Sequence, residues 1–76
     1  MNKTFRYQEA INPDVERLSA LERQVLELVV RGFSNKEIAG QLDVTLDAIR
    51  WHLKNIYHKL HVHSRTEAVL KFRLRA

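Results

Sequence analysis

Residues 45–60 combine side chains whose types and spacing suit contact with nucleic acid. In an α-helix, which turns about 100° per residue, the outward side carries Asp47, Trp51, Lys54, Asn55 and His58, with Arg50 on its flank. Arginine and lysine can donate to guanine O6 and N7, and a tryptophan ring can pack on a thymine methyl group or on the sugar-phosphate backbone. An aromatic ring, two cations and an amide on one exposed helix face can therefore reach base edges and phosphates in a major groove. The competing interpretation is a solvated helix face, with Trp51 packed on a neighbouring helix or a second copy of the chain.

The elements that position these residues can be predicted from apolar spacing and capping signals. The opposite side of the helix is apolar and must face a core. Its residues are Leu46, Ile49, Leu53, Ile56 and Leu60. A shorter helix is expected to start at Ser34, because Ser34 and Glu37 form a Ser-x-x-Glu capping box. Asp43 and Val44 then make a turn in which Val44 fills the corner, and Thr45 caps the next helix. This spacing predicts a helix-turn-helix.

Two further helices complete the predicted fold. The Ser-x-x-Glu signal recurs at Ser19 and Ser64, so helices are expected over about Ala20 to Arg31 and from Ser64 to about Leu74. The packing side of the first of these helices is predicted to be Leu21, Val25, Leu28 and Val29. Phe33 precedes a helix cap and is expected in the core. The fold class is therefore all-α, a small four-helix domain.

Several blocks of the sequence resemble the DNA-binding domain of LuxR/FixJ/GerE-type transcription regulators. They are LSALERQVLELVVRGFSNKEIAGQLDV, AIRWHLKNIYHKL and SRTEAV, which span about Leu18 to Leu70. The resemblance implies a LuxR-type C-terminal effector domain at residues 18–76, after an N-terminal segment at 1–17 that is a linker or a short helix. It also implies a cytoplasmic bacterial regulator that binds double-stranded DNA, with Thr45 to Leu60 as the recognition helix. In the family, the positions of Arg50, Trp51 and Lys54 touch bases.

The remaining candidate contacts lie at helix starts and in the last helix. Backbone N–H groups at a helix start favour an anion, and the phosphate-contact candidates there are Asn35, Lys36, Thr45 and Arg65. In the resembled family the C-terminal helix is a dimerisation element, so Val69 and Phe72 are assigned to a homodimer that reads half-sites about one turn of DNA apart. Two positions depart from the family pattern. His61 stands where glycine is usual, and Ala48 stands where threonine is common.

Composition limits the other functions. Thirteen Lys and Arg against nine Asp and Glu give a net charge of +4, and residues 1–17 hold three of each sign, so the excess belongs to the helical domain. This balance favours an anionic partner. With no cysteine and no apolar run of membrane length, a disulfide framework and a membrane span are not expected. No nucleotide loop or nucleophile with a base is present, so neither an enzyme nor a cofactor is expected. The histidines at 58, 61 and 63 are not expected to hold a metal, because the dipole at the end of a helix already explains His58 and His61.

Two alternatives remain open at this stage. A region-4-like module of an RNA polymerase sigma factor shares the Leu-Ser-x-x-Glu-Arg opening and would bind promoter DNA as a monomer. A protein-interaction module would pair through its apolar C-terminal helix with another regulator and titrate it; Asp47 and Ala48 keep this alternative open, whereas Arg50 and Lys54 argue against it. RNA polymerase is a further partner considered for the regulator itself.

Overall fold

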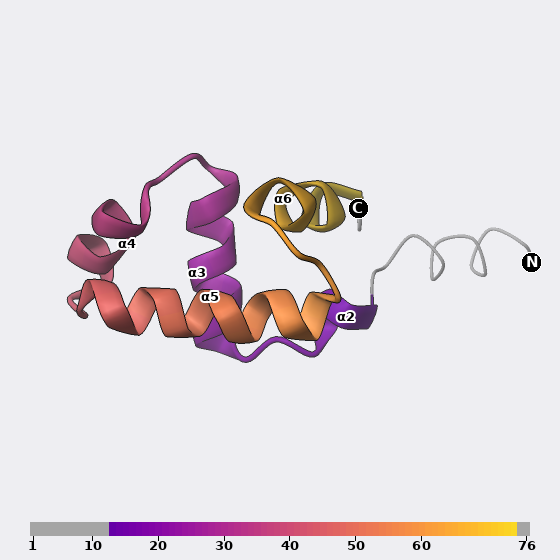
Figure 1. Cartoon of the computed structure of the whole chain (residues 1–76), viewed down its shortest axis with the longest axis horizontal. Coiled ribbons are helices and arrows are strands. Elements are labelled where there is room, and N and C mark those ends of the chain that lie inside the picture. The colour runs from indigo at the N-terminus through magenta and orange to yellow at the C-terminus, as the bar shows by residue number, and fades with distance from the viewer. Residues whose placement is uncertain (1–12, 75–76) are drawn as a thin grey trace, which may run out of the picture.

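The computed structural model describes residues 13–74, and all secondary structure within that range is helical (Figure 1). The helices are α2 (Pro13–Glu16), α3 (Ala20–Val30), α4 (Asn35–Leu42), α5 (Leu46–Leu60) and α6 (Arg65–Leu74). The all-α class and the four expected helices are confirmed, with the short helix α2 in front of them. Residues 1–12 of the expected N-terminal segment lie outside the described residues.

Local side-chain bonds explain why α3 and α4 begin where they do. The Ser19 hydroxyl accepts from the backbone N–H of Glu22 at 3.1 Å, and the Glu22 carboxylate accepts from the Ser19 N–H at 2.9 Å. Ser34 and Glu37 repeat this reciprocal pair at 3.1 and 2.8 Å. Both capping boxes are confirmed, and each satisfies two backbone groups that the helix itself cannot pair.

The starts of α5 and α6 use simpler caps. Thr45 Oγ1 accepts from the N–H of Ala48 at 3.0 Å. Ser64 Oγ accepts from the N–H of Glu67 at 3.1 Å, but the Glu67 carboxylate bonds to the N–H of His63 at 2.8 Å instead of closing the box on Ser64. The predicted start of α6 near Ser64 is therefore right, although the Glu67 carboxylate binds the N–H of His63 and not that of Ser64.

Left-handed residues lie on both sides of α5. Asp43 ends α4 with φ 58°, and His61 ends α5 with φ 59°. The glycine usual at position 61 is thus replaced by a residue that still adopts the conformation for which glycine is favoured. The expectation that Val44 fills the corner of the turn is wrong, because this residue is 38% exposed.

The core draws on every described helix. Its fully buried members include Val15, Val25, Leu26, Val29, Ile38, Ile49, Ile56, Leu60 and Ala68. Since Val15 belongs to α2, the packed unit includes residues before the expected boundary at Leu18. Two assignments of residues to the core need correction. Leu21 is 40% exposed and Leu46 is only partly buried, and each lies in the first turn of its helix. Phe33 is partly buried and packs against the core, as expected.

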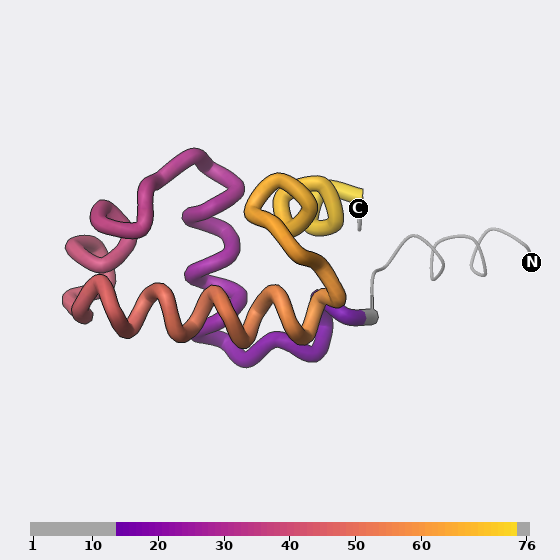
Figure 2. The backbone as a smooth tube through the Cα atoms, in the orientation of Figure 1, coloured from indigo at the N-terminus to yellow at the C-terminus, as the bar shows by residue number. Residues whose placement is uncertain are grey.

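The long helix α5 is the element on which the others are assembled. It contacts α3 and α4 most extensively and also touches α2 and α6. The tube in Figure 2 shows α4 beside the N-terminal end of α5, α2 beside its C-terminal end, and α3 crossing it between them. One side of α5 is therefore covered along its length, and the opposite side is left to carry the candidate site.

Candidate nucleic-acid interface

The three residues predicted to touch bases lie together on the uncovered side of α5. Trp51 is 61% exposed, the side chain of Arg50 is 63% exposed, and Lys54 is also exposed. The apolar residues behind them, Ile49 and Leu53, are buried. Packing of Trp51 on a neighbouring helix is thus not observed, although its ring meets His52 edge-on with centroids 5.4 Å apart. An indole, a guanidinium and an ammonium group are presented on one rigid surface.

An acidic residue belongs to the same surface. Asp47 lies in the first turn of α5, and its Oδ1 is 3.2 Å from Nη1 of Arg50. Both side chains are well exposed, so the pair contributes little to the stability of the fold. The pair places the Arg50 guanidinium beside the Asp47 carboxylate.

Three of the four phosphate-contact candidates line one shallow depression beside the start of α4. Asn35, Lys36 and Arg65 border it, together with Arg50 from α5. The backbone N–H groups that α4 cannot pair within the helix also lie at this end of it. Thr45 is not part of this depression, and its hydroxyl is used to cap α5. The structure thus brings three cationic side chains to a helix start, an arrangement that suits a phosphate.

Arg65 has a second role that the sequence did not suggest. Its Nη1 donates to Oδ1 of Asn35 at 2.9 Å, and its Nη2 donates to the backbone carbonyl of Phe33. These bonds join the first residue of α6 to the first residue of α4 and to Phe33 in the connection before it. Arginine has five N–H donors, so these two bonds leave donors for a phosphate. Arg65 therefore holds together the segments that form the depression, and it also borders the depression itself.

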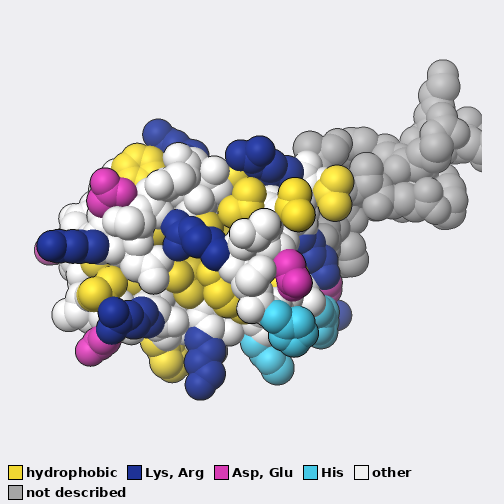
Figure 3. Space-filling model, turned by 45° about the horizontal axis from the view of Figure 1, so that its top comes forward, with side chains coloured by type: hydrophobic (Ala, Val, Ile, Leu, Met, Phe, Trp, Pro, Cys, Tyr) yellow, Lys and Arg dark blue, Asp and Glu magenta, His cyan; other side chains and the backbone are white. Residues whose placement is uncertain are grey.

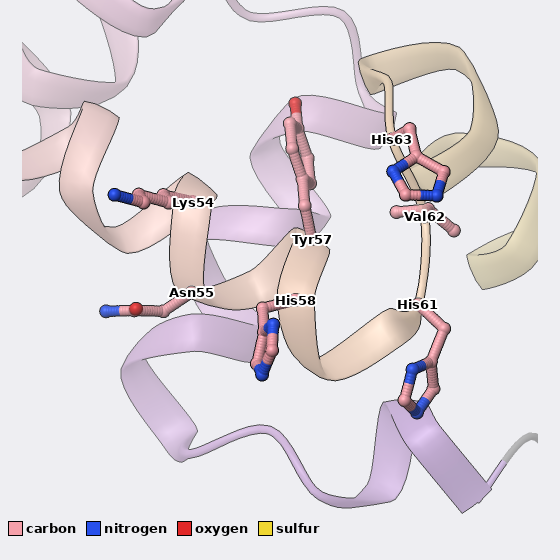
Figure 4. Close-up of a pocket in the computed structure, with 7 residues that line it drawn as sticks. All are labelled: Lys54, Asn55, Tyr57, His58, His61, Val62 and His63. Carbon is pink, nitrogen blue, oxygen red and sulfur yellow. The ribbon is translucent and has the colours of Figure 1, made fainter.

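A second depression follows the C-terminal half of α5 and carries the histidines. Lys54, Asn55 and Tyr57 border it with His58, His61 and His63 (Figure 4). Figure 4 shows the three imidazoles spread around the rim and not converging on a common point. Among the described side chains, no group of three or more His, Cys, Asp or Glu is arranged to hold a metal ion. Burial raises the pKa of the Tyr57 hydroxyl, and the charge of Arg65 opposes that rise.

A partly buried ion pair holds α5 against α3. Nζ of Lys59 lies 2.7 Å from Oε1 of Glu22, a glutamate that is only 8% exposed. Burial alone would raise the pKa of the Glu22 carboxyl. The hydrogen bonds from Lys59 and from the Ser19 backbone outweigh it, so that the pKa lies below its usual value. The partner of Glu22 thus comes from the helix that carries the candidate site.

A second set of charged contacts joins α2, α5 and α6. Nζ of Lys71 lies 3.0 Å from Asp14 and donates to the carbonyl of Leu60, the last residue of α5, at 2.6 Å. The hydrogen bond from Lys71 is the main reason that the pKa of Asp14 is lowered. This contact satisfies a carbonyl at the end of α5, where the helix has no partner of its own.

The exposed apolar side chains of α6 are not those singled out from the sequence. Val69 and Phe72 are half-buried and pack on the core of their own chain, whereas Leu70 is 56% and Leu74 is 76% exposed. Figure 3 shows hydrophobic side chains interspersed with lysines and arginines on one face of the molecule, and histidines gathered at one side of that face. An assignment of α6 to an interface between copies remains a prediction, and Leu70 and Leu74 are the residues that reach solvent.

Comparison with known proteins gives consistent matches. A family model described as "Bacterial regulatory proteins, luxR family" matches residues 16–72. The HTH-type transcriptional regulator MalT of Cronobacter sakazakii is 43% identical over 72 residues, 91% of this chain and 8% of that protein. AlkS of Pseudomonas putida, also an HTH-type transcriptional regulator, is 46% identical over 54 residues, 71% of this chain and 6% of AlkS. The monoamine regulon transcriptional regulator of Klebsiella aerogenes is 48% identical over 52 residues, 68% of this chain and 23% of that protein.

The chain thus spans less than a quarter of the length of these relatives. Within residues 13–74, no helix is both long and apolar enough to cross a membrane.

Proposed function

Because the chain belongs to the luxR family of bacterial regulatory proteins, we propose that it binds duplex DNA sequence-specifically and regulates transcription. The observation that carries this proposal is the exposed side of α5, where Arg50, Trp51 and Lys54 lie on a helix whose other side is buried. Such a helix can enter a major groove without disturbing the core behind it. The protein would then act in the cytoplasm, where bacterial DNA lies.

The contacts divide into two kinds. Arg50 and Lys54 donate to guanine acceptors, and Trp51 packs on a thymine methyl group or the adjoining sugar, so these residues supply sequence preference. The depression beside the start of α4, with Lys36 and Arg65 at its edge, receives a phosphate. Phosphate contacts supply much of the affinity and make it depend on salt. Thr45, as the cap of α5, and Asn35 support the same backbone contacts.

The protein binds DNA as a homodimer in this proposal. The exposed leucines of α6, Leu70 and Leu74, support an apolar contact between two copies, with Val69 and Phe72 at its base. A two-fold dimer reads a palindrome whose half-sites lie about 10 base pairs apart. The exposed leucines provide the cleaner test, since Leu70→Glu adds a charge at a site that the core does not use. Sedimentation with DNA is expected to give two chains per site for the wild type and one for this variant.

The test of the proposal is selection from a random-sequence duplex pool, with affinity measured by fluorescence anisotropy at two salt concentrations. We expect binding that weakens steeply with salt and a bound fraction enriched in a palindrome. Enrichment of a single non-palindromic site would favour a sigma region-4-like monomer. Absence of binding at low salt would refute the DNA-binding function and leave pairing with another regulator as the function to test.

A further inference from the structure

Asp47 is the one acidic side chain of α5, and it lies within the proposed DNA-reading surface. Trp51 and Lys54 follow it by four and seven residues, which places all three on one side of the helix. The Asp47 side chain is 91% exposed, and its Oδ1 lies 3.2 Å from Nη1 of Arg50. A carboxylate and a guanidinium are therefore presented to a partner as an adjacent pair.

Capping and the helix dipole do not explain why the acidic residue lies on this side of α5. Thr45 already caps the helix by accepting from the N–H of Ala48. An acidic residue in the first turn is favoured by the helix dipole, but that benefit is the same on a side turned away from DNA. On the reading side, Asp47 approaches phosphates of like charge and must give up water. It lowers DNA affinity unless a hydrogen-bond donor meets it there.

The major groove offers such a donor. A carboxylate only accepts hydrogen bonds. The carboxylate suits the N4 amine of cytosine. It suits adenine less well, because adenine places the acceptor N7 beside its amine, and N7 repels the second carboxylate oxygen. Arg50 suits guanine O6 and N7. Asp47 and Arg50 present their carboxylate and guanidinium side by side, with Oδ1 and Nη1 3.2 Å apart. The pair can therefore meet two neighbouring bases.

We propose that Asp47 determines specificity by accepting a hydrogen bond from N4 of a cytosine next to the guanine bound by Arg50. This inference rests on the proposed DNA-binding function and adds the base that the acidic residue selects. It also gives the ion pair a function. Asp47 orients Arg50 in the absence of DNA and keeps its own acceptor for the neighbouring base.

The test compares Asp47→Ala and Asp47→Asn with a matched control, Asp43→Asn. Asp43 is exposed and carries the same charge, but it lies in the turn before α5 at φ 58°, a conformation that asparagine adopts readily. Each protein is selected on the random duplex pool and then titrated on the preferred site and on copies with the cytosine changed. Far-UV circular dichroism checks that each variant is folded.

For the wild type, replacing the cytosine is expected to weaken binding by about tenfold or more. Asp47→Ala is expected to bind random DNA more tightly and to lose nearly all preference at that position, and Asp47→Asn to shift it toward adenine. Asp43→Asn keeps the wild-type preference. If Asp47→Ala tightens binding to every sequence alike and leaves the selected site unchanged, Asp47 only repels DNA and the inference is overturned. A wild type without salt-dependent binding refutes the DNA-binding function itself.

Discussion

Replacement of Glu22 by glutamine should loosen the attachment of the reading helix to the core. Glutamine keeps an oxygen for the N–H of Ser19 but removes the charge that pairs with Lys59 at 2.7 Å. Loss of one partner from a fully buried pair costs about 3–5 kcal/mol, and an exposed pair contributes about 0.2–1 kcal/mol. The Glu22 side chain is 10% exposed and that of Lys59 is 39% exposed. We therefore expect an intermediate loss of about 1–2 kcal/mol in the free energy of unfolding.

The loss should depend on pH in a defined direction. The pKa of Glu22 in the folded chain lies below its usual value of 4.5. Its stabilising contribution is therefore complete above that value and disappears as the pH falls through the folded-state pKa. The difference between wild type and Glu22→Gln should shrink in acid. Near neutral pH it is a large share of the roughly 4–11 kcal/mol expected for a chain of this size.

Urea unfolding followed by far-UV circular dichroism measures this effect. Fluorescence is a poor reporter because Trp51 is already 61% exposed in the folded chain. Glu27→Gln is the matched control, since Glu27 is an exposed glutamate of the same helix, and it should change the unfolding free energy by less than about 0.5 kcal/mol. A Glu22→Gln variant as stable as the wild type, or a deficit that does not shrink in acid, would refute the reasoning.

Three further predictions concern single positions. Lys54→Ala should cost about 1–3 kcal/mol of binding on the preferred site and less on random DNA; an equal loss in both anisotropy titrations would make Lys54 a phosphate contact. In thermal melts, His61→Val should unfold at a lower temperature than His61→Gly, because φ at this position is 59° and valine is strained there; the reverse order would contradict the left-handed cap. Asp14→Asn should lower the melting temperature near neutral pH, and the deficit should vanish well below pH 3.8, because the hydrogen bond from Lys71 lowers the pKa of Asp14; a deficit that persists in acid would assign the effect to shape rather than charge.

The helix starts could be predicted because their causes are local. Ser19 and Ser34 each bond to a residue three positions along the chain, so the short sequence contains the whole interaction. The core stripe of α5 was predictable for the same reason, since helical periodicity is a property of the segment itself. The prediction of this stripe was wrong only at Leu46, the first residue of α5, which is only partly buried.

The contacts that hold the site together could not be predicted in this way. Glu22 could be assigned to a helix cap from its spacing to Ser19, but its ion-pair partner Lys59 lies 37 residues away. Arg65 and Asn35 are 30 residues apart, and both were assigned to phosphate from their places at helix starts with no indication that they bond to each other. Val69 and Phe72 were selected on α6 from the family resemblance. The resemblance does not show which side of this helix faces the core of its own chain. The roles of the predicted base and phosphate contacts remain predictions.

The division of α5 into a buried side and an exposed side has an evolutionary consequence. Ile49, Ile56 and Leu60 are fully buried and serve folding, whereas Trp51 and Arg50 make no contribution to the core. Substitutions at exposed helix positions usually change stability by less than about 0.5 kcal/mol. Mutation can therefore alter the outer residues of this helix freely while selection preserves the inner ones. The partner contacted by the outer side of α5 can therefore change through successive substitutions while every intermediate sequence still folds.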